Sequence, residues 1–468
     1  MQRGRPGPLL IRGFIPRLLQ FFRCSSFFSL VNCSLGCYNA SASRQREKMQ
    51  NIEGNAMKEI KQACLKYMLA FGYWIIAGGL IGGLCGVIGG FFAMGVEWAT
   101  HLRQHHDWLL YLLPLGGLMI AGLYRLLRLP LSLGTDEIIK TVRTQGKVPL
   151  QMAPAIFLST GVTHLFGGSA GREGAALQLG GSIGAKIGNL VHPRQDGQRI
   201  FELCGMAALF SALFGTPLTA TIFVLEIIEV GKFNDRALMP CLVSAICAKL
   251  AALAIGAPAE IFPLASGLEG VHALSLVQSG LIGIACALCA IAFCCIMHFA
   301  NRHFRRVIGN DFLRIALGGA AIIGLSLLLG TRDYNGGGMH VIFSALEGHA
   351  RPEAFLLKML FTALTLGAGF KGGEIVPSFF IGATLGCTLA GLIGLSPALG
   401  AALGLIGVFC GVTNAPLAAM MLSIELFGVE YLPLFGLTAV ISYMLSGHFS
   451  LYHAQLFFQP KLGRDQEE

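Results

Sequence analysis

The chain has 468 residues, of which 54% are hydrophobic and only 13% are charged, and its formal net charge is +9. Soluble proteins carry about 25% charged residues, so the composition excludes an ordinary soluble domain, and the many apolar residues exclude a disordered chain. Residues 375–424 contain no Asp, Glu, Lys or Arg, and one bilayer crossing needs about 20 apolar residues. The sequence therefore predicts a polytopic membrane protein.

The positive charge is concentrated at the N-terminus. Residues 1–66 hold 11 Lys or Arg and 3 Asp or Glu, whereas residues 67–468 hold 23 and 22. Such a basic leader is typical of a targeting peptide or a surface-binding helix, and a translation start assigned too early, ahead of Met49 or Met57, explains it equally well. The rest of the chain is nearly neutral, which argues against nucleic-acid binding.

Residues 67–460 predict a transmembrane domain of helices, several of them too short to cross the bilayer. Short segments interrupted by Gly or Pro are typical of helices that end at a binding site within the membrane. The polar loop 331–352 divides them into two uneven sets, and we expect 461–468 to be a short tail without a soluble domain. The predicted segments are 67–96, 108–127, 150–166, 174–191, 199–213, 215–230, 237–257, 273–298, 313–330, 355–370, 376–394, 397–413, 415–428 and 431–447.

An internal repeat relates two parts of this domain. Residues 214–220 read FGTPLTA and continue to Glu226, while residues 413–419 read TNAPLAA and continue to Glu425, with nine residues from Pro to Glu in both. Two related halves are characteristic of transporters, with the site between them. We expect Glu226 and Glu425 to hold loops or helix ends.

Glycine-rich breaks precede a pair of repeat-related helices. Residues 167–174 read GGSAGREG and residues 369–377 read GFKGGEIVP. Glycine costs about 1 kcal/mol relative to alanine inside a helix, so both stretches predict loops, and the helix start after each offers unpaired N–H groups to an anion. Two such starts at one point predict binding of a small halide by backbone amides, without a fixed cation. Lys371 and Glu374 are expected to pair within the second break.

Glu173 is the candidate functional side chain, because a carboxylate in a membrane segment is costly. When ionised, it would compete with an anion at the neighbouring site, and when protonated it would leave. The alternative is a permanent pair with Arg172, which is disfavoured because adjacent residues on a helix point to different faces.

A different class of function is an intramembrane serine hydrolase. Residues 167–171 match G-x-S-x-G, with Ser169 as nucleophile and His164 or His453 as base. That motif requires a strand before the serine, whereas residues 155–166 predict a helix, so this alternative is distant. A carrier of neutral solutes is disfavoured because both breaks present helix starts.

The cysteines do not suggest a cofactor. Cys286, Cys289, Cys294 and Cys295 lie in the charge-free run 271–300, which favours packing of small apolar residues over a disulfide framework or a metal site. We expect no metal, no cofactor and no enzymatic activity.

The motifs G-R-E-G at 171–174 and G-x-x-x-P at 373–377, with the paired P-L-x-A helices, resemble the CLC family of chloride channels and chloride/proton antiporters. The resemblance covers about residues 70–460 in order. It implies an all-α, polytopic fold with an inverted two-half repeat of tilted and broken helices. It also implies a homodimer in the plasma or bacterial inner membrane, with one anion pathway per subunit and pairing through the 200–250 and 400–446 helices.

The resemblance also implies roles for individual residues. Glu173 falls on the family's gating glutamate, and Tyr452 on the central tyrosine whose hydroxyl contacts the anion. Without the resemblance, Tyr452 reads as a tyrosine of the membrane interface. The implied anion-binding residues are Gly134, Gly171, Arg172, Gly174, Ile375, Val376 and Tyr452.

Several positions depart from the family pattern. Leu133 stands where the family has a serine that binds the anion, and Ala175 replaces a proline. Ile227 replaces the internal proton-transfer glutamate, a feature shared by the fluoride-exporting branch, which residues 369–386 also resemble. That branch has a threonine at Val376. The expected cargo is chloride by family default, with fluoride open, and transport is gated by or coupled to protons through Glu173. The alternative is a passive voltage- or pH-gated chloride channel.

Overall fold

The computed structural model describes residues 39–144, 146, 148–191, 195–257, 262, 270–458, 460 and 461. Most of the predicted leader, residues 1–38, and most of the predicted tail, residues 462–468, lie outside the described residues. The chain divides into two units, residues 1–71 and 72–468. In the first unit the described residues form one helix, which continues without a break across the predicted boundary at 66/67.

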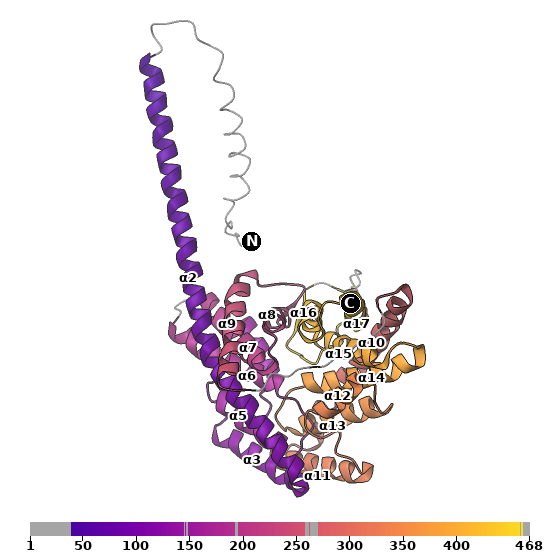
Figure 1. Ribbon diagram of the computed structural model, residues 1–468. Helices are drawn as coiled ribbons and strands as arrows, with labels where there is room; N and C mark the ends of the chain where they lie inside the picture. Colours follow the sequence, from indigo (N-terminus) through magenta and orange to yellow (C-terminus); the bar gives the residue numbers. More distant parts are fainter. Residues whose placement is uncertain are drawn as a thin grey trace, which may run out of the picture. The chain divides into compact units, whose positions relative to one another are not determined.

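The described residues form two successive sets of eight α-helices (Figure 1). The first set is α2 (Asn39–His105), α3 (Leu113–Leu126), α4 (Thr135–Thr144), α5 (Met152–Leu165), α6 (Glu173–Val191), α7 (Gln195–Phe214), α8 (Pro217–Glu226) and α9 (Asp235–Ala254), with a 3-10 helix, η1 (Asp107–Leu112), before α3. The second set is α10 (Ala273–Val307), α11 (Asp311–Leu329), α12 (Met339–Leu346), α13 (Ala354–Ala368), α14 (Ile375–Ile393), α15 (Pro397–Thr413), α16 (Pro416–Phe427) and α17 (Leu432–Leu445).

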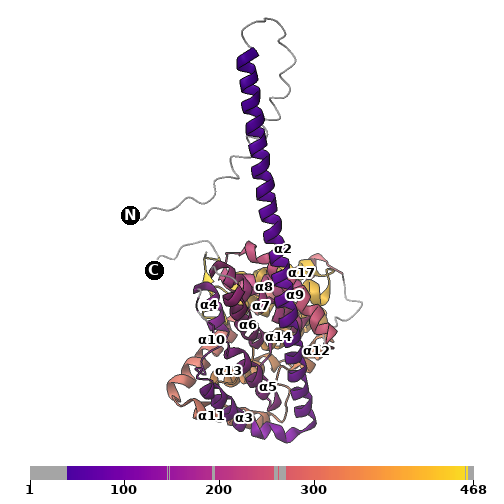
Figure 2. The same cartoon turned by 90° about the vertical axis from the view of Figure 1, so that its left-hand side faces the viewer.

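The two sets use the same packing partners, which identifies them as the two halves of the repeat. Helix α6 packs on α7 as α14 packs on α15, and α7 packs on α9 as α15 packs on α17. Within the second unit, α2 contacts α7 and α9 as α10 contacts α15 and α17. Helices α3 and α11 lie side by side (Figure 2).

The repeat boundary differs from the predicted one. The halves meet between α9 and α10, at residues 255–272, so the polar loop 331–352 lies within the second half. That loop contains α12, the counterpart of α4, and neither short helix was among the predicted segments. Both lack the long apolar run on which the prediction depended. The other predicted segments are confirmed as helical, most of them within a few residues at each end. The exceptions are 67–96, which lies inside the much longer α2, and 273–298, because α10 continues to Val307.

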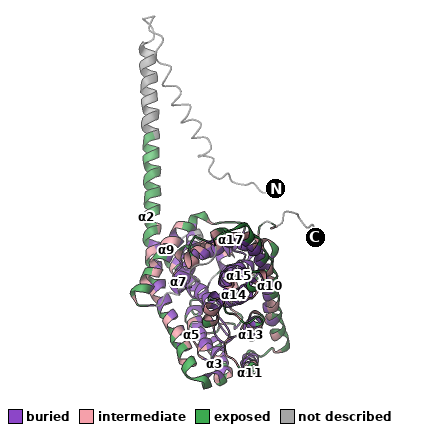
Figure 3. Cartoon of the chain, turned by 45° about the vertical axis from the view of Figure 1, so that its right-hand side comes forward, coloured by how far each residue is buried: buried purple, intermediate pink, exposed green. Residues whose placement is uncertain are grey.

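Six helical segments are long and apolar enough to cross a membrane, and the remaining apolar helices are shorter. The six are Met57–His105, Asp107–Leu126, Asp235–Ala254, Ala273–Val307, Asp311–Leu329 and Ile375–Ile393. Burial is greatest at the centre, where nearly every residue of α15 and most of α14 are inaccessible to solvent (Figure 3). These helices therefore pack against protein rather than lipid.

Glycines let the central helices approach each other at backbone distance. A Cβ atom at Gly180 would overlap the carbonyl oxygen of Gly205, and a Cβ at Gly382 would overlap that of Gly404. The first pair joins α6 to α7 and the second joins α14 to α15. Small residues that allow such contact are the usual basis of helix packing in membranes.

The two repeat-related glutamates cap each other's helices. Glu226, at the end of α8, accepts hydrogen bonds from the amides of Leu417 (3.1 Å) and Ala418 (2.9 Å) at the start of α16. Glu425, near the end of α16, accepts from the amides of Leu218 (3.0 Å) and Thr219 (2.8 Å) at the start of α8. A carboxylate at a helix N-terminus satisfies orphan N–H groups and the helix dipole. The expectation that both glutamates hold helix ends is confirmed.

A short parallel strand pair fixes the C-terminal segment to the end of α8. Strand β1 (Glu229–Val230) pairs with β2 (Leu456–Phe457), with Glu229 opposite Leu456. This pairing returns the chain after α17 toward the first half of the repeat.

We predict that Gly382→Ala destabilises the protein, whereas Gly391→Ala on the same helix does not. The new methyl group at 382 meets the Gly404 carbonyl oxygen, while nothing lies within 4 Å of the corresponding position at 391. Overpacking costs about 1–3 kcal/mol, and alanine at an open helical site is favoured over glycine by up to about 1 kcal/mol. Thermal unfolding midpoints in detergent measure both effects, and equal shifts for the two variants would contradict the packing account.

Candidate functional site

The two glycine-rich breaks meet at the centre of the molecule. The first lies between α5 and α6 and the second between α13 and α14. The amide of Gly171 donates to the carbonyl of Gly373 (2.8 Å), and the amide of Gly373 donates to the carbonyl of Gly171 (2.7 Å). We call this pair of hydrogen bonds the glycine bridge. It brings the N-termini of α6 and α14 together, as the repeat predicted.

Only glycine permits this approach. A Cβ at Gly373 would overlap the amide nitrogen of Gly174, and a Cβ at Gly174 would lie 2.9 Å from the Cα of Gly373. The first turns of both helices therefore stand backbone to backbone. Each helix N-terminus carries unpaired N–H groups and about half a positive charge, so the bridge concentrates positive potential at one point.

Glu173 is buried at that point. Its side chain is 1% exposed, and its Oε2 accepts a hydrogen bond from the main-chain amide of Arg172 (3.0 Å). The carboxylate folds back over Gly171, where a Cβ would overlap Oε2, and the side chains of Val376 and Pro377 border the same space. A carboxylate thus occupies the place where the two helix starts would attract an anion.

A cavity of about 490 Å³ leads to Glu173, and we call it the gate-side cavity. Five of its charged or titratable lining groups come from helices of the first half, and part of its lining comes from the loop before α12 and from α12 itself. Among the residues that line it are Glu97, Arg103, His164, Arg172, Asn335 and Val376.

A second cavity, of about 120 Å³, reaches the bridge from the side of Tyr452, and we call it the tyrosine-side cavity. Gly171 lines the first cavity, whereas Gly372 and Glu374 line the second, so the glycine bridge stands between them. The tyrosine-side cavity is also lined by Gly134, Asp136, Gln178, Lys371, Tyr452 and His453.

Tyr452 presents a free hydroxyl to this cavity. Its side chain is 2% exposed, and its hydroxyl has no hydrogen-bond partner among the described residues. The backbone around it is fixed, because the amide of Ala454 donates to Asp136 (3.0 Å) and Arg143 donates to the carbonyl of Ala454 (2.6 Å). Helix α4 therefore holds the tyrosine segment beside Gly134.

The predicted site residues gather around the glycine bridge. Gly171, Arg172, Glu173 and Val376 line the gate-side cavity, and Gly134 and Tyr452 line the tyrosine-side cavity. Gly174 and Ile375 are buried in the first turns of α6 and α14 between them.

The expected pair of Lys371 and Glu374 does not form. The ammonium group of Lys371 donates instead to the carbonyls of Leu131 (2.7 Å) and Leu133 (2.6 Å). In the described part of the chain, the Oε2 atom of Glu374 has no hydrogen-bond partner. That prediction was wrong because the fold brings main-chain carbonyls of the first-half loop 131–133 within hydrogen-bond distance of the Lys371 ammonium group.

Sequence analysis missed Glu374 as a candidate functional residue. It lies on the tyrosine side of the bridge, as Glu173 lies on the gate side. The two glutamates are 201 residues apart, within one residue of the 202 that separate Gly171 from Gly373. The signal was therefore present, and it was masked by the assumption that Lys371 neutralises Glu374.

The geometry does not support a hydrolase. Ser169 follows helix α5 rather than a strand, its side chain is fully buried, and its hydroxyl lies 3.1 Å from that of Thr362. His164 faces the carbonyl of Gly171 (3.3 Å), and the ring of His453 lies against that of His298, with centroids 3.6 Å apart and the planes tilted by 32°.

Comparison with known proteins identifies the family. The family model described as voltage gated chloride channel matches residues 116–447. This chain belongs to the CLC family. It is therefore an integral membrane protein, and a channel or transporter rather than an enzyme.

The chain is more than 30% identical to a curated relative and to a solved structure. A chloride/fluoride channel protein from Pseudomonas syringae pv. tomato is 35% identical over 389 residues, covering 82% of this chain and 86% of the relative. The crystal structure of a CLC-type fluoride/proton antiporter is 31% identical, covers 82% of this chain and 98% of its own, and has a TM-score of 0.79.

A structure with lower sequence identity has the same fold. A slow cyanobacterial Cl⁻/H⁺ antiporter is 23% identical over 80% of this chain and 94% of its own, with a TM-score of 0.67. The all-α CLC architecture with its two-half repeat, predicted from the sequence, is confirmed.

We predict that Tyr452→Phe weakens halide binding, whereas Tyr124→Phe does not. Both tyrosines are buried and both hydroxyls have no partner among the described residues, but Tyr452 lines a cavity on the candidate path. A hydrogen bond to a charged group contributes about 1.5–3 kcal/mol, so affinity should fall by roughly tenfold or more. Calorimetric titration of the purified protein with halide measures this, and equal affinities for the two variants would refute the role.

Proposed function

We propose that this protein exchanges a halide, preferentially fluoride, for protons, and that Glu173 is the gate. The observation that carries the proposal is the position of the Glu173 carboxylate where the starts of α6 and α14 meet. A halide that reaches this point must displace the carboxylate. Protonation removes the charge that competes with the halide, so proton and anion binding at this site are linked.

Backbone amides are the proposed halide ligands. The first turns of α6 and α14 meet at the bridge, and the initial N–H groups of a helix have no intrahelical acceptors. Fixed dipoles of this kind stabilise a dehydrated anion without reorganisation. Tyr452 adds a hydroxyl donor from the other side. These features support the proposed roles of Gly134, Gly171, Arg172, Gly174, Ile375, Val376 and Tyr452.

Fluoride is preferred over chloride on the basis of the relatives. Chloride is the family default, but the chloride/fluoride channel protein and the fluoride/proton antiporter described above are both named for fluoride. The break F-K-G-G-E supports the same choice. Val376 stands where the fluoride-exporting branch has threonine, so the experiment below includes both halides.

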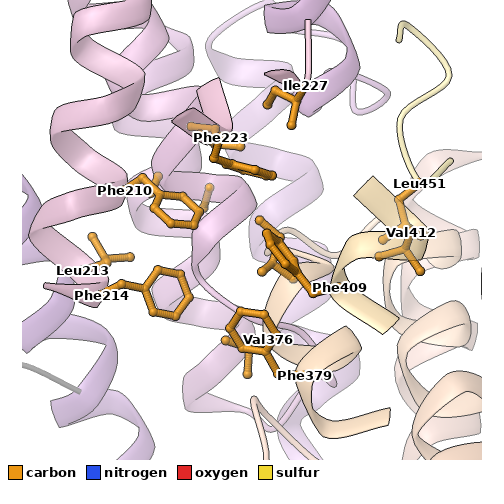
Figure 4. Packing of buried hydrophobic residues seen from close by; sticks show 14 of the residues in the cluster. Phe210, Leu213, Phe214, Phe223, Ile227, Val376, Phe379, Phe409, Val412 and Leu451 are labelled. Atoms are coloured by element: carbon orange, nitrogen blue, oxygen red, sulfur yellow. The ribbon is translucent and has the colours of Figure 1, made fainter. Parts of the chain in front are cut away.

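Protons are proposed to use the same route as the halide. The rings of Phe210, Phe214, Phe379, Phe409 and Phe223 form a closed circle of contacts, with successive centroids 4.8–5.7 Å apart. Figure 4 shows this circle between Ile227, at the end of α8, and Val376. Five buried aromatic rings offer no proton acceptor, and Ile227 adds none.

We assign proton transfer to the two carboxylates nearest to the glycine bridge in sequence, one on each side of it. Glu173 lies on the gate side and Glu374 on the tyrosine side. Carboxylates buried in a membrane protein are candidates for proton transfer by default. A proton passing from Glu374 to Glu173 would cross the point at which the halide is bound.

A homodimer is proposed for the assembly. Helices α8, α9, α16 and α17 present exposed apolar side chains that no other described part of the chain covers. They include Leu218, Leu250, Leu253, Leu417 and Val440. These residues lie within the 200–250 and 400–446 regions or next to them, which supports the predicted pairing surface.

We predict that Glu173→Gln retains halide flux but loses both proton uptake and pH dependence. Glutamine leaves the helix starts in place and cannot exchange a proton. The measurement is efflux of fluoride and chloride from liposomes with simultaneous recording of pH, over about two pH units around neutrality.

Glu97→Gln is the matched control, because Glu97 lines the same cavity and lies beside His101 (3.8 Å) rather than at the bridge. It should keep coupled transport. If Glu173→Gln still drives protons uphill on a halide gradient, Glu173 is not the gate. If the parent protein moves halide without protons, the passive channel is the function.

A further inference from the structure

One face of α13 carries a lysine and two threonines that the mechanism above does not use. Lys358, Thr362 and Thr365 follow at i, i+4 and i+7, which places them on one side of the helix. The repeat-related helix α5 carries Ile156, Thr160 and Thr163 at the same spacing, 202 residues earlier. The repeat therefore keeps both threonines, and only the second half has the lysine.

Lys358 is a fully buried cation. Its side chain is 0% exposed, and its ammonium group donates to the carbonyls of Tyr334 (3.1 Å) and Gly336 (2.7 Å). The same nitrogen lies 5.0 Å from the centroid of the Phe380 ring. Within the described residues it forms no ion pair with a carboxylate. Two carbonyl acceptors and an aromatic face make a cage for an ammonium ion, which compensates for the cost of burying the charge.

The loop that Lys358 holds is joined to the first glycine-rich break. The side-chain amide of Asn335 donates to the carbonyl of Gly167 (2.9 Å), and the amide of Gly336 donates to the carbonyl of Gly168 (3.1 Å). Residues 334–336 thus connect Lys358 to the segment that leads into Glu173. We call residues 334–336 the clamp loop.

The two threonines act on the next residue of the same break. The hydroxyl of Thr365 accepts from the amide of Ser169 (3.0 Å), and the hydroxyl of Thr362 lies 3.1 Å from that of Ser169. One face of α13 therefore fixes Gly167 and Gly168 through the clamp loop and Ser169 directly. The glycine bridge at Gly171 begins two residues later.

We propose that Lys358 is a positioning residue for halide binding, acting through the clamp loop on the break before α6. It fixes the break so that the first-turn amides of α6 and the carboxylate of Glu173 face the halide site. The inference rests on the proposed function, because it assigns a task to Lys358 only if the halide binds at the bridge.

A purely electrostatic role is the competing explanation. The charged or titratable groups around Lys358 and the gate-side cavity come from several elements: Arg103 and His101 on α2, His164 on α5, Arg172 at the break, His340 on α12, and the acids Glu97 and Glu173. A field effect of the ammonium charge would not depend on Asn335, which is neutral. Action through the clamp loop would depend on it, since Asn335 is a link in the same chain of contacts.

A double-mutant cycle with Lys358→Met and Asn335→Leu separates the two explanations. Fluoride and chloride are titrated onto the purified full-length protein by calorimetry, and half-saturating concentrations and maximal fluxes are measured in liposomes. Each single variant should weaken halide binding about tenfold, while maximal flux per folded protein stays within about twofold. The double variant should bind the halide no more weakly than the single variant with the lower affinity. Both substitutions interrupt the same chain of contacts between Lys358 and the break, so their effects should not add.

Lys461→Met is the matched control. Lys461 also donates to a carbonyl, that of Tyr443 (2.7 Å), and lies 4.0 Å from the centroid of that residue's ring, but it lines neither cavity. It should leave halide affinity unchanged. If Lys358→Met yields no folded protein, the cycle uses Lys358→Gln, which keeps an N–H donor on a shorter side chain.

Losses that multiply in the double variant, or unchanged affinity in Lys358→Met, would overturn the proposal. Proton coupling is read separately from Glu173→Gln. The gate assignment can therefore fail while the cycle still shows coupling between Lys358 and Asn335. Conversely, Glu173 can prove to be the gate while the cycle shows no such coupling.

Discussion

The centre of this protein depends on the backbone contact between Gly171 and Gly373. Two reciprocal hydrogen bonds hold two helix starts against each other, although the positive ends of their dipoles repel. A negative charge between them relieves that repulsion. The carboxylate of Glu173 supplies such a charge in the structure, and in the proposed mechanism a halide supplies it when the carboxylate leaves. The proposed anion site is therefore a consequence of how the two halves are joined.

The surrounding scaffold keeps the two helix starts in place. Glycine contacts join α6 to α7 and α14 to α15 at backbone distance. Glu226 and Glu425 tie the start of each repeat-related helix, α16 and α8, to the end of the other. Because both devices occur once in each half, the halves meet as near equivalents, and the bridge lies where they meet.

Much of this arrangement was predictable from the sequence. The breaks at 167–174 and 369–377 contain enough glycine to end a helix, and their common offset predicted that the two helix starts are related. The apolar segments gave most helix boundaries. The motifs G-R-E-G and G-x-x-x-P were sufficient to suggest the family before any comparison.

What the sequence did not reveal depends on contacts between distant segments. Helices α4 and α12 are short and carry no long apolar run, so hydropathy does not detect them. Lys371 was assigned to its neighbour Glu374, but it bonds carbonyls about 240 residues away. Lys358 lies in an apolar helix, and the sequence does not reveal its partners. Its acceptors are main-chain carbonyls, which every residue has, so no residue type marks them.

These two lysines break the symmetry of the repeat. Lys358 holds the carbonyls of residues 334 and 336, before α12, and Lys371 holds those of residues 131 and 133, before α4. The first loop borders the gate-side cavity and the second borders the tyrosine-side cavity. The repeat counterparts of Lys358 and Lys371 are Ile156 and Ser169, which carry no charge. Side chains of one segment, from α13 to the start of α14, thus hold a loop at each of the two cavities. Because this segment also carries Glu374 and Gly373, a movement of it would alter both cavities and the bridge together.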